Sequence, residues 1–121
     1  MIPNGYQKYQ QNSVMTASPK ELILMLYNGA IKFCNLAIQA FEDGEVQKQH
    51  MYLMKAQDII TELELSLDTK YEISKEISIL YKYIKELLME ANIKKDVQKV
   101  LEAKDLINDF RNTWQELMKI V

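Results

Sequence analysis

Residues 18–42 carry hydrophobic side chains on nearly every face of the helix that they predict. One stripe, at alternating spacings of three and four, comprises Leu22, Leu26, Gly29, Phe33, Leu36 and Ala40, and a second, roughly opposite, comprises Leu24, Tyr27, Ile31, Cys34, Ile38 and Phe41. Ser18, Pro19 and Glu21 have the pattern of a capped helix start. Gly44 can adopt the left-handed conformation that ends a helix. Because only a wedge of about 60–80° is polar, such a helix must be buried on nearly all sides.

Three further segments have the spacing of helices that bury one face. The seam at 45–67 comprises Leu53, Ala56, Ile60, Leu63 and Leu67; the seam at 71–91 comprises Ile73, Ile77, Leu80, Ile84, Leu87 and Ala91, flanked by Tyr81 and Leu88; the seam at 97–120 comprises Val100, Ala103, Ile107, Phe110, Trp114, Leu117 and Val121. Asn92 can end the third helix, and Asp96 can cap the fourth. Short connections between four such helices predict an all-α fold, an antiparallel up-down four-helix bundle.

Residues 1–17 are polar and rich in Gln and Asn, so we expect an extended, mobile N-terminal tail before a single helical domain at 18–121. Four apolar side chains interrupt this tail: Tyr6, Tyr9, Val14 and Met15. They either pin the terminus to the bundle or form a detachable cover over an apolar groove. Composition alone does not separate these two interpretations.

The composition, with 48% hydrophobic and 26% charged residues among 121, is that of a globular helical protein. A net charge of −2 argues against nucleic acid as the main partner, because phosphate binding needs a clustered basic surface. Cys34 is the only cysteine, which excludes an internal disulfide and fits a reducing compartment. Lys32 interrupts the best candidate for a membrane span, and the N-terminus lacks a signal-peptide pattern. We therefore expect a cytoplasmic (cytosolic) protein without membrane contact.

The pattern contains no recognisable catalytic or metal site. His50 is the only histidine, and no second His or Cys stands at ligand spacing, so the di-metal pattern of helical bundles is absent. Glu102, Asp105 and Asp109 share one helix face, for which a solvated charged surface is a better explanation than an acid–base pair. Gly-rich phosphate loops are also missing. We expect that the protein is not an enzyme and that it binds neither a metal ion nor a cofactor.

The surplus apolar surface of residues 18–42 indicates binding. One candidate class is a protein-binding module or chaperone whose groove receives an amphipathic or disordered segment. The other is a self-associating structural or adaptor subunit that hides the same face in a homodimer. Wheel geometry gives the following candidates for the groove: Leu24, Tyr27, Ile31, Ile38, Met51, Met54, Leu65, Ile79 and Tyr83. Ile31 and Ile38 fit the core nearly as well.

The most specific residues lie at the junction of the tail and the first predicted helix. Here the chain reads Tyr6-x-x-Tyr9-Gln10, Ser13-Val14, Thr16-Ala17-Ser18-Pro19, Leu22, Met25-Leu26-Tyr27 and Gly29. This block resembles the opening of the flagellin-specific flagellar export chaperone family of bacteria. The likeness continues at Lys55-Ala56, Glu90-Ala91-Asn92 and Phe110-Arg111 before Trp114, and it covers essentially the whole chain.

The resemblance implies a cytosolic chaperone that binds the disordered C-terminal segment of flagellin in an apolar groove. Such a chaperone prevents premature polymerisation and delivers flagellin to the flagellar type III export apparatus. The expected partners are flagellin and an export gate component, with other flagellar regulators as further candidates. In the family the N-terminal tail can occupy part of the groove, which favours the detachable cover. The sequence leaves open a monomer or a swapped homodimer.

Overall fold

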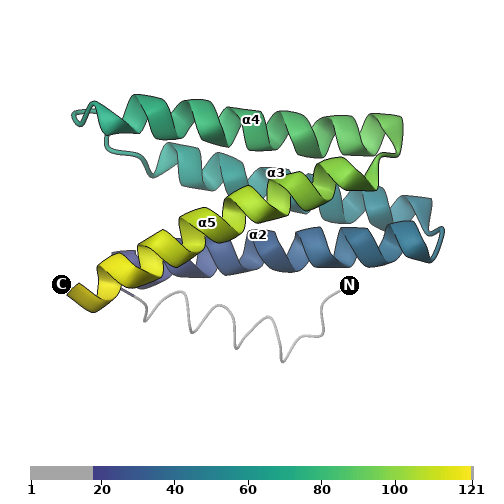
Figure 1. The fold of residues 1–121 in the computed structure, drawn as a ribbon, viewed down its shortest axis with the longest axis horizontal. Coiled ribbons are helices and arrows are strands. Elements are labelled where there is room, and N and C mark those ends of the chain that lie inside the picture. Colours follow the sequence, from purple (N-terminus) through teal and green to yellow (C-terminus); the bar gives the residue numbers. More distant parts are fainter. Residues whose placement is uncertain (1–17, 121) are drawn as a thin grey trace.

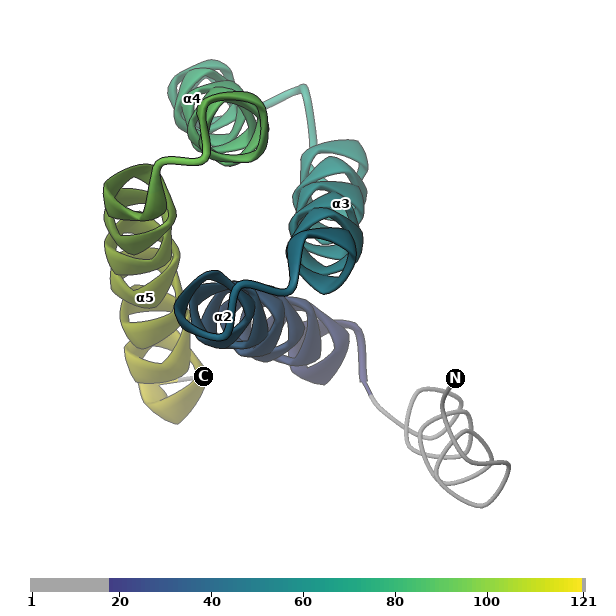
Figure 2. The same cartoon turned by 90° about the vertical axis from the view of Figure 1, so that its right-hand side faces the viewer.

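The computed structural model describes residues 18–120, which form four α-helices (Figure 1). These are α2 (Pro19–Glu42), α3 (Val46–Leu65), α4 (Ile73–Lys94) and α5 (Val97–Ile120). Successive helices pack against one another in antiparallel directions, and α5 closes the ring against α2 (Figure 2). The predicted all-α four-helix bundle is confirmed. The expected tail at 1–17, with Tyr6, Tyr9, Val14 and Met15, lies outside the described residues, as does Val121.

Local capping sets the ends of these helices much as the sequence predicts. The Ser18 hydroxyl accepts a hydrogen bond of 3.2 Å from the Glu21 backbone N–H, with Pro19 in the first turn. Gly44 follows α2 with a φ of 68°, in the left-handed region. The prediction for α4 was wrong at its end, because the helix continues past Asn92 to Lys94 and stops at left-handed Lys95 (φ 54°).

The core accounts for the unusual composition of α2. The side chains that this helix buries most deeply are small apart from one tyrosine: Tyr27, Ala30, Cys34, Ala37 and Ala40. On one side of this line Phe33 stacks on Tyr52 of α3, with ring centroids 6.2 Å apart. On the other side Tyr27 stacks on Phe110 of α5 at 6.1 Å. Because α3 and α5 cover both predicted stripes, the surplus of apolar surface on α2 is smaller than the wheel alone indicates.

Helix α2 also satisfies, by length and composition alone, the test for a membrane-spanning helix, with a mean hydropathy of 1.3. The core helix of a soluble protein satisfies the same test, since it too is long and apolar. In the bundle α2 packs between α3 and α5.

The course of α5 explains where the predicted seams fail. This helix lies beside α4 near the 94–97 connection and diverges from it toward the C-terminus, where it lies beside α2 (Figures 1 and 2). Burial along its seam falls in the same direction, from fully buried Val100 and Ile107 to half-buried Trp114 and finally to Leu117, which is 49% exposed. The prediction that Leu117 belongs to the core was therefore wrong.

The same divergence affects α4. Two of its predicted core residues, Ile73 and Leu80, are 57% and 42% exposed. The predicted flanking residues Tyr81 and Leu88 are instead fully buried, because α4 packs against α3 as well as against α5. Near its N-terminal end α4 is no longer packed against α5. Ile73 therefore has the spacing of a core residue, but no helix covers it.

Candidate partner-binding groove

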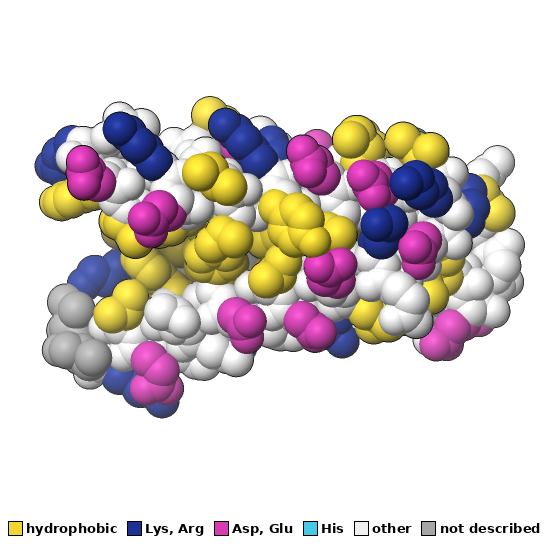
Figure 3. Space-filling view, turned by 45° about the horizontal axis from the view of Figure 1, so that its top comes forward, with side chains coloured by type: hydrophobic (Ala, Val, Ile, Leu, Met, Phe, Trp, Pro, Cys, Tyr) yellow, Lys and Arg dark blue, Asp and Glu magenta, His cyan; other side chains and the backbone are white. Residues whose placement is uncertain are grey.

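The diverging ends of α4 and α5 leave an apolar groove at one end of the bundle, visible as a hollow lined by hydrophobic side chains in Figure 3. Its volume is about 470 Å³. All four helices or their connections contribute to the lining, which consists of Ile23, Tyr27, Ser66, Leu67, Asp68, Tyr71, Ile73, Ser74, Ile77, Tyr81, Phe110, Thr113, Trp114 and Leu117. A cavity of this size, open at one side and mostly apolar, suits one face of a bound helix or extended segment.

Three aromatic rings from three helices meet in the groove, and we call Tyr27, Tyr81 and Phe110 its floor. The hydroxyl oxygens of Tyr27 and Tyr81 are 2.6 Å apart and share a hydrogen bond. The Phe110 ring lies nearly parallel to that of Tyr27 and is tilted by 50° against that of Tyr81, with centroids 6.1 and 5.1 Å away. The floor thereby ties α2, α4 and α5 together below the opening.

Burial dominates the electrostatics of the floor. It raises the pKa of both phenols above the usual 10.0, and the shared hydrogen bond raises the pKa of Tyr81 further while it lowers that of Tyr27. Both rings therefore stay neutral at physiological pH. Asp68 is the only ionisable carboxylate or cation among the described lining residues, so the groove presents a neutral interior.

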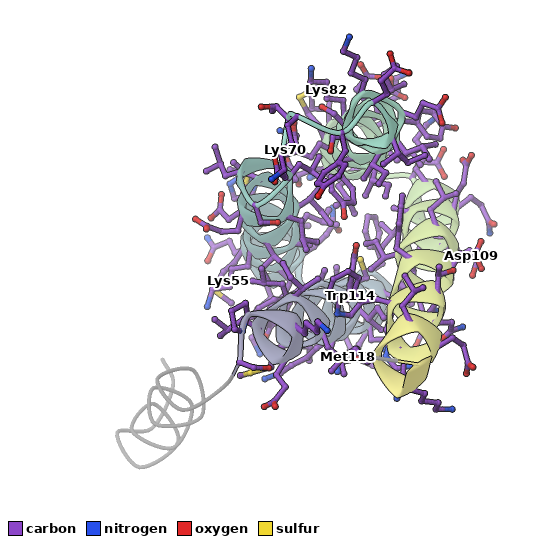
Figure 4. All side chains as sticks on the ribbon, turned by 90° about the vertical axis from the view of Figure 1, so that its left-hand side faces the viewer. Lys55, Lys70, Lys82, Asp109, Trp114 and Met118 are labelled. Carbon is purple, nitrogen blue, oxygen red and sulfur yellow. The ribbon has the colours of Figure 1, made fainter. Side chains whose placement is uncertain are left out.

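Most polar groups at the rim are bonded within the protein. The Ser74 hydroxyl donates to the Asp68 carbonyl at 2.6 Å, and the Ser66 hydroxyl donates to a carbonyl of α3 at 2.7 Å. The Trp114 indole N–H donates to the Lys20 carbonyl at 2.9 Å, and this contact holds α5 to the first turn of α2. Figure 4 shows Trp114 between α5 and α2. These donors hold the walls of the groove in place, and they need no hydrogen-bond acceptor from a ligand.

Of the predicted groove residues, the structure places only Tyr27 in this groove, where it is nearly buried. The others are spread over several surfaces: Leu24 is half-buried on α2, Ile31 and Ile38 pack half-buried against the core, and Met51, Met54, Leu65, Ile79 and Tyr83 are exposed on α3 and α4. Their role in binding stays a prediction.

The spacing of several lining residues predicts core positions. Ile73, Ile77, Phe110, Trp114 and Leu117 have the seam pattern of their helices, and no signal in that pattern distinguishes them from Ile84 or Ile107. Identifying them needs the crossing angle between α4 and α5, which depends on side-chain packing along both helices.

The polar residues considered for chemistry are separate from the groove. Nδ1 of His50 lies 2.7 Å from the side-chain amide nitrogen of Asn92, at the other end of α4. Glu102 accepts a hydrogen bond of 2.6 Å from the Tyr83 hydroxyl. Within residues 18–120 no group of three or more His, Cys, Asp or Glu side chains is placed to hold a metal ion.

The fold and the groove define a helical bundle with an apolar opening between two of its helices, an arrangement that is typical of binding proteins. Comparison with known proteins specifies the family. The family model described as "Flagellar protein FliS" matches residues 2–121, and the chain belongs to that family. The resemblance inferred from the N-terminal block is confirmed.

Named relatives agree with this assignment. The chain is 43% identical over 118 residues to the flagellar secretion chaperone FliS of Bacillus subtilis (strain 168), covering 98% of this chain and 89% of the relative. It is 33% identical over 119 residues to that of Escherichia coli (strain K12), covering 93% and 88%. A solved flagellar chaperone from bacteria superposes with a TM-score of 0.79 over 97% of both chains at 18% identity, which supports the fold.

Family membership also determines the class of function. The family consists of flagellar secretion chaperones, a non-enzymatic role, and the chain is accordingly a chaperone with a partner in flagellar export. Its members are soluble proteins, so α2 is a core helix of a soluble bundle, as its packing between α3 and α5 indicates.

Proposed function

We propose that the chain binds the disordered C-terminal segment of flagellin in the groove between α4 and α5. In the cytoplasm it would prevent premature polymerisation and deliver flagellin to the type III export apparatus, where a gate component is the second expected partner. The observation that carries the proposal is the exposure of apolar side chains inside one concave site. Tyr71 and Ile73 are each 57% exposed and Leu117 is 49% exposed, although all three line the groove. Clustered apolar exposure of this kind is typical of a binding surface.

The physical basis of binding is apolar burial coupled to folding of the segment. An amphipathic segment that becomes helical can lay its apolar face along the exposed side chains of α4 and α5. Burial contributes about 25 cal/mol per Å² of apolar surface, from which the cost of ordering the segment must be subtracted. Because Asp68 is the only ionic residue in the part of the lining that residues 18–120 form, we expect affinity to depend weakly on salt.

The start of α2 supports a role for the N-terminal tail as a cover. The Lys20 carbonyl is bonded to Trp114, a lining residue, so the chain enters the bundle at the rim of the groove. Tyr6, Tyr9, Val14 and Met15 precede this point by a short stretch of chain. We propose that they cover part of the groove until flagellin displaces them. Deletion of residues 1–14 should then accelerate association with flagellin, and an unchanged association rate would contradict the cover.

Calorimetric titration with a peptide of roughly the last 40–50 residues of the host's flagellin, a length on the scale of helix-in-groove targets, tests the proposal. One-to-one binding with a large negative heat-capacity change and a gain of helicity is expected. Absence of heat and of helicity, in a protein that sediments as a dimer at all concentrations, would contradict it. That result would favour the homodimeric structural subunit.

A further inference from the structure

The floor of the groove contains one more hydroxyl hydrogen than residues 18–120 can bond. Each phenol carries one O–H, and only one of the two hydrogens can lie in the 2.6 Å bond between Tyr27 and Tyr81. Within residues 18–120 neither hydroxyl has another hydrogen-bond partner. Both residues are buried, with 5% and 3% of their surface exposed, and both line the groove. One phenolic donor is therefore left over at the bottom of an apolar site.

The other buried or half-buried polar donors of the lining already have hydrogen-bond acceptors within the protein. The hydroxyls of Ser66 and Ser74 and the indole N–H of Trp114 all donate to main-chain carbonyls. Thr113 and Tyr71 are both exposed, in contrast to the two buried tyrosines of the floor. The surplus donor of the tyrosine pair is thus the buried lining donor that has no acceptor within residues 18–120, and an uncompensated buried donor is unfavourable.

We propose that the segment bound in the groove places a neutral hydrogen-bond acceptor, the side-chain amide or hydroxyl of an Asn, Gln, Ser or Thr, against the Tyr27–Tyr81 pair. This contact sets the register of the segment along the groove. The proposal rests on the proposed function, since it specifies how the segment bound there is recognised.

A neutral acceptor fits this site better than a carboxylate. Among the described lining residues there is no Lys or Arg, and Asp68 is the only charged one, so a buried carboxylate would have no counter-charge among them. The raised pKa values of both phenols agree with a floor that disfavours negative charge. A backbone carbonyl of a helical segment is already occupied within its own helix, which leaves a side chain as the acceptor.

The contact would determine register because the rest of the groove discriminates poorly. Apolar side chains such as Ile73 and Leu117 accept any apolar residue of similar size, so a helix could bind shifted by one turn. A single buried polar contact removes this degeneracy, as one Asn does in coiled coils.

The test is a peptide scan against matched protein variants. Each Asn, Gln, Ser and Thr of the C-terminal flagellin peptide is replaced singly by Ala, and its affinity is measured for the unmodified chain and for Tyr27→Phe/Tyr81→Phe. This double variant keeps both rings on Phe110 and removes both hydroxyls, a change that is nearly neutral for stability when the shapes match. Tyr52→Phe is the control, because it removes a hydroxyl from a half-buried ring that stacks on Phe33 outside the groove.

We expect one peptide position at which the Ala replacement weakens binding roughly 3- to 12-fold with the unmodified chain and with Tyr52→Phe, but less than about twofold with the double variant. Equal losses at every position in all three proteins would overturn the proposal. So would a scan of the unmodified chain in which no position costs more than about twofold, whether or not the double variant folds. A peptide that fails to bind the unmodified chain would overturn the proposed function itself, a result distinct from binding without a coupled position.

Discussion

Replacing Ile73 by Ala tests whether the groove, rather than another apolar surface, holds the partner. Ile73 begins α4 and is 57% exposed in the groove. The matched control is Ile93→Ala, at the other end of the same helix, where the side chain is 72% exposed and outside the groove. Both substitutions remove the same atoms from the same helix, so a difference between them reports position alone.

The magnitude follows from the exposed fraction. Complete burial of an Ile side chain is worth about 1.5–3 kcal/mol, so covering the exposed 57% would contribute about 0.9–1.7 kcal/mol. Alanine retains its Cβ, so we expect a loss of about 0.7–1.3 kcal/mol, or about three- to ninefold in Kd. Ile93→Ala should change Kd by less than about twofold, because exposed residues outside an interface contribute little to binding.

The assay is calorimetric titration with the C-terminal flagellin peptide, accompanied by urea unfolding of each variant. Neither exposed side chain should alter the free energy of unfolding by more than about 0.5 kcal/mol. An effect of Ile93→Ala equal to or larger than that of Ile73→Ala would refute the placement of the site. Leu65→Ala, at a side chain that is 75% exposed on α3, extends the comparison to the candidates chosen from wheel geometry.

Three further predictions concern the bundle itself. Gly29→Ala places a Cβ 3.2 Å from the flexible end of Ile59, and because helix propensity improves by about 0.8–1 kcal/mol, urea unfolding should show a net gain of about 0.5 kcal/mol; a loss would mean that Ile59 cannot shift. Gly44→Ala meets no atom within 4 Å but has a φ of 68°, so we expect a loss of about 1 kcal/mol, which an unchanged midpoint would contradict. Burial raises the pKa of Cys34 from its ordinary 9.0 to about 12, so above pH 9 the thiol ionises in the unfolded chain before it does in the folded one. The free energy of unfolding should therefore fall as pH rises above 9. Rapid thiol labelling of the folded protein at pH 8 would contradict the burial of this thiol.

The periodicity of the sequence predicted the architecture because each helix buries a seam long enough to identify it. Val100, Ala103 and Ile107 are buried as their spacing predicts. The inner face of α4 was predicted less well, since a helix in a ring has two neighbours, and its buried face lies between them. Tyr81 was thus placed at an edge, although it forms part of the floor. The spacing of apolar residues along the sequence does not specify where the two adjacent helices lie around α4.

The candidate site was harder to predict for a related reason. A groove that accepts an apolar segment is a core from which one element is missing, and its residues carry the pattern of a core. Ile73 and Leu117 have seam spacing, and they are exposed because α4 and α5 diverge before the seam ends. Exposed residues such as Met51 and Met54 break the core pattern and so indicate a binding surface, whereas the lining residues continue the core pattern.

On α5 the apolar seam extends farther along the helix than the contact with α4 that would bury it. On α5 the apolar seam continues from Ile107 through Trp114 to Leu117, whereas burial falls along the same stretch. A seam that outlasts its neighbouring helix implies that something else covers it, because about half of a Leu side chain left in water forgoes roughly 1 kcal/mol of burial. In the proposed function the flagellin segment takes the place of that neighbour and completes the bundle. Leu117→Asp should then weaken peptide binding strongly while it leaves the free bundle folded, since this side chain is 49% exposed without a partner. Loss of the helical circular-dichroism signal in Leu117→Asp would instead assign Leu117 to the core and remove the basis for the groove.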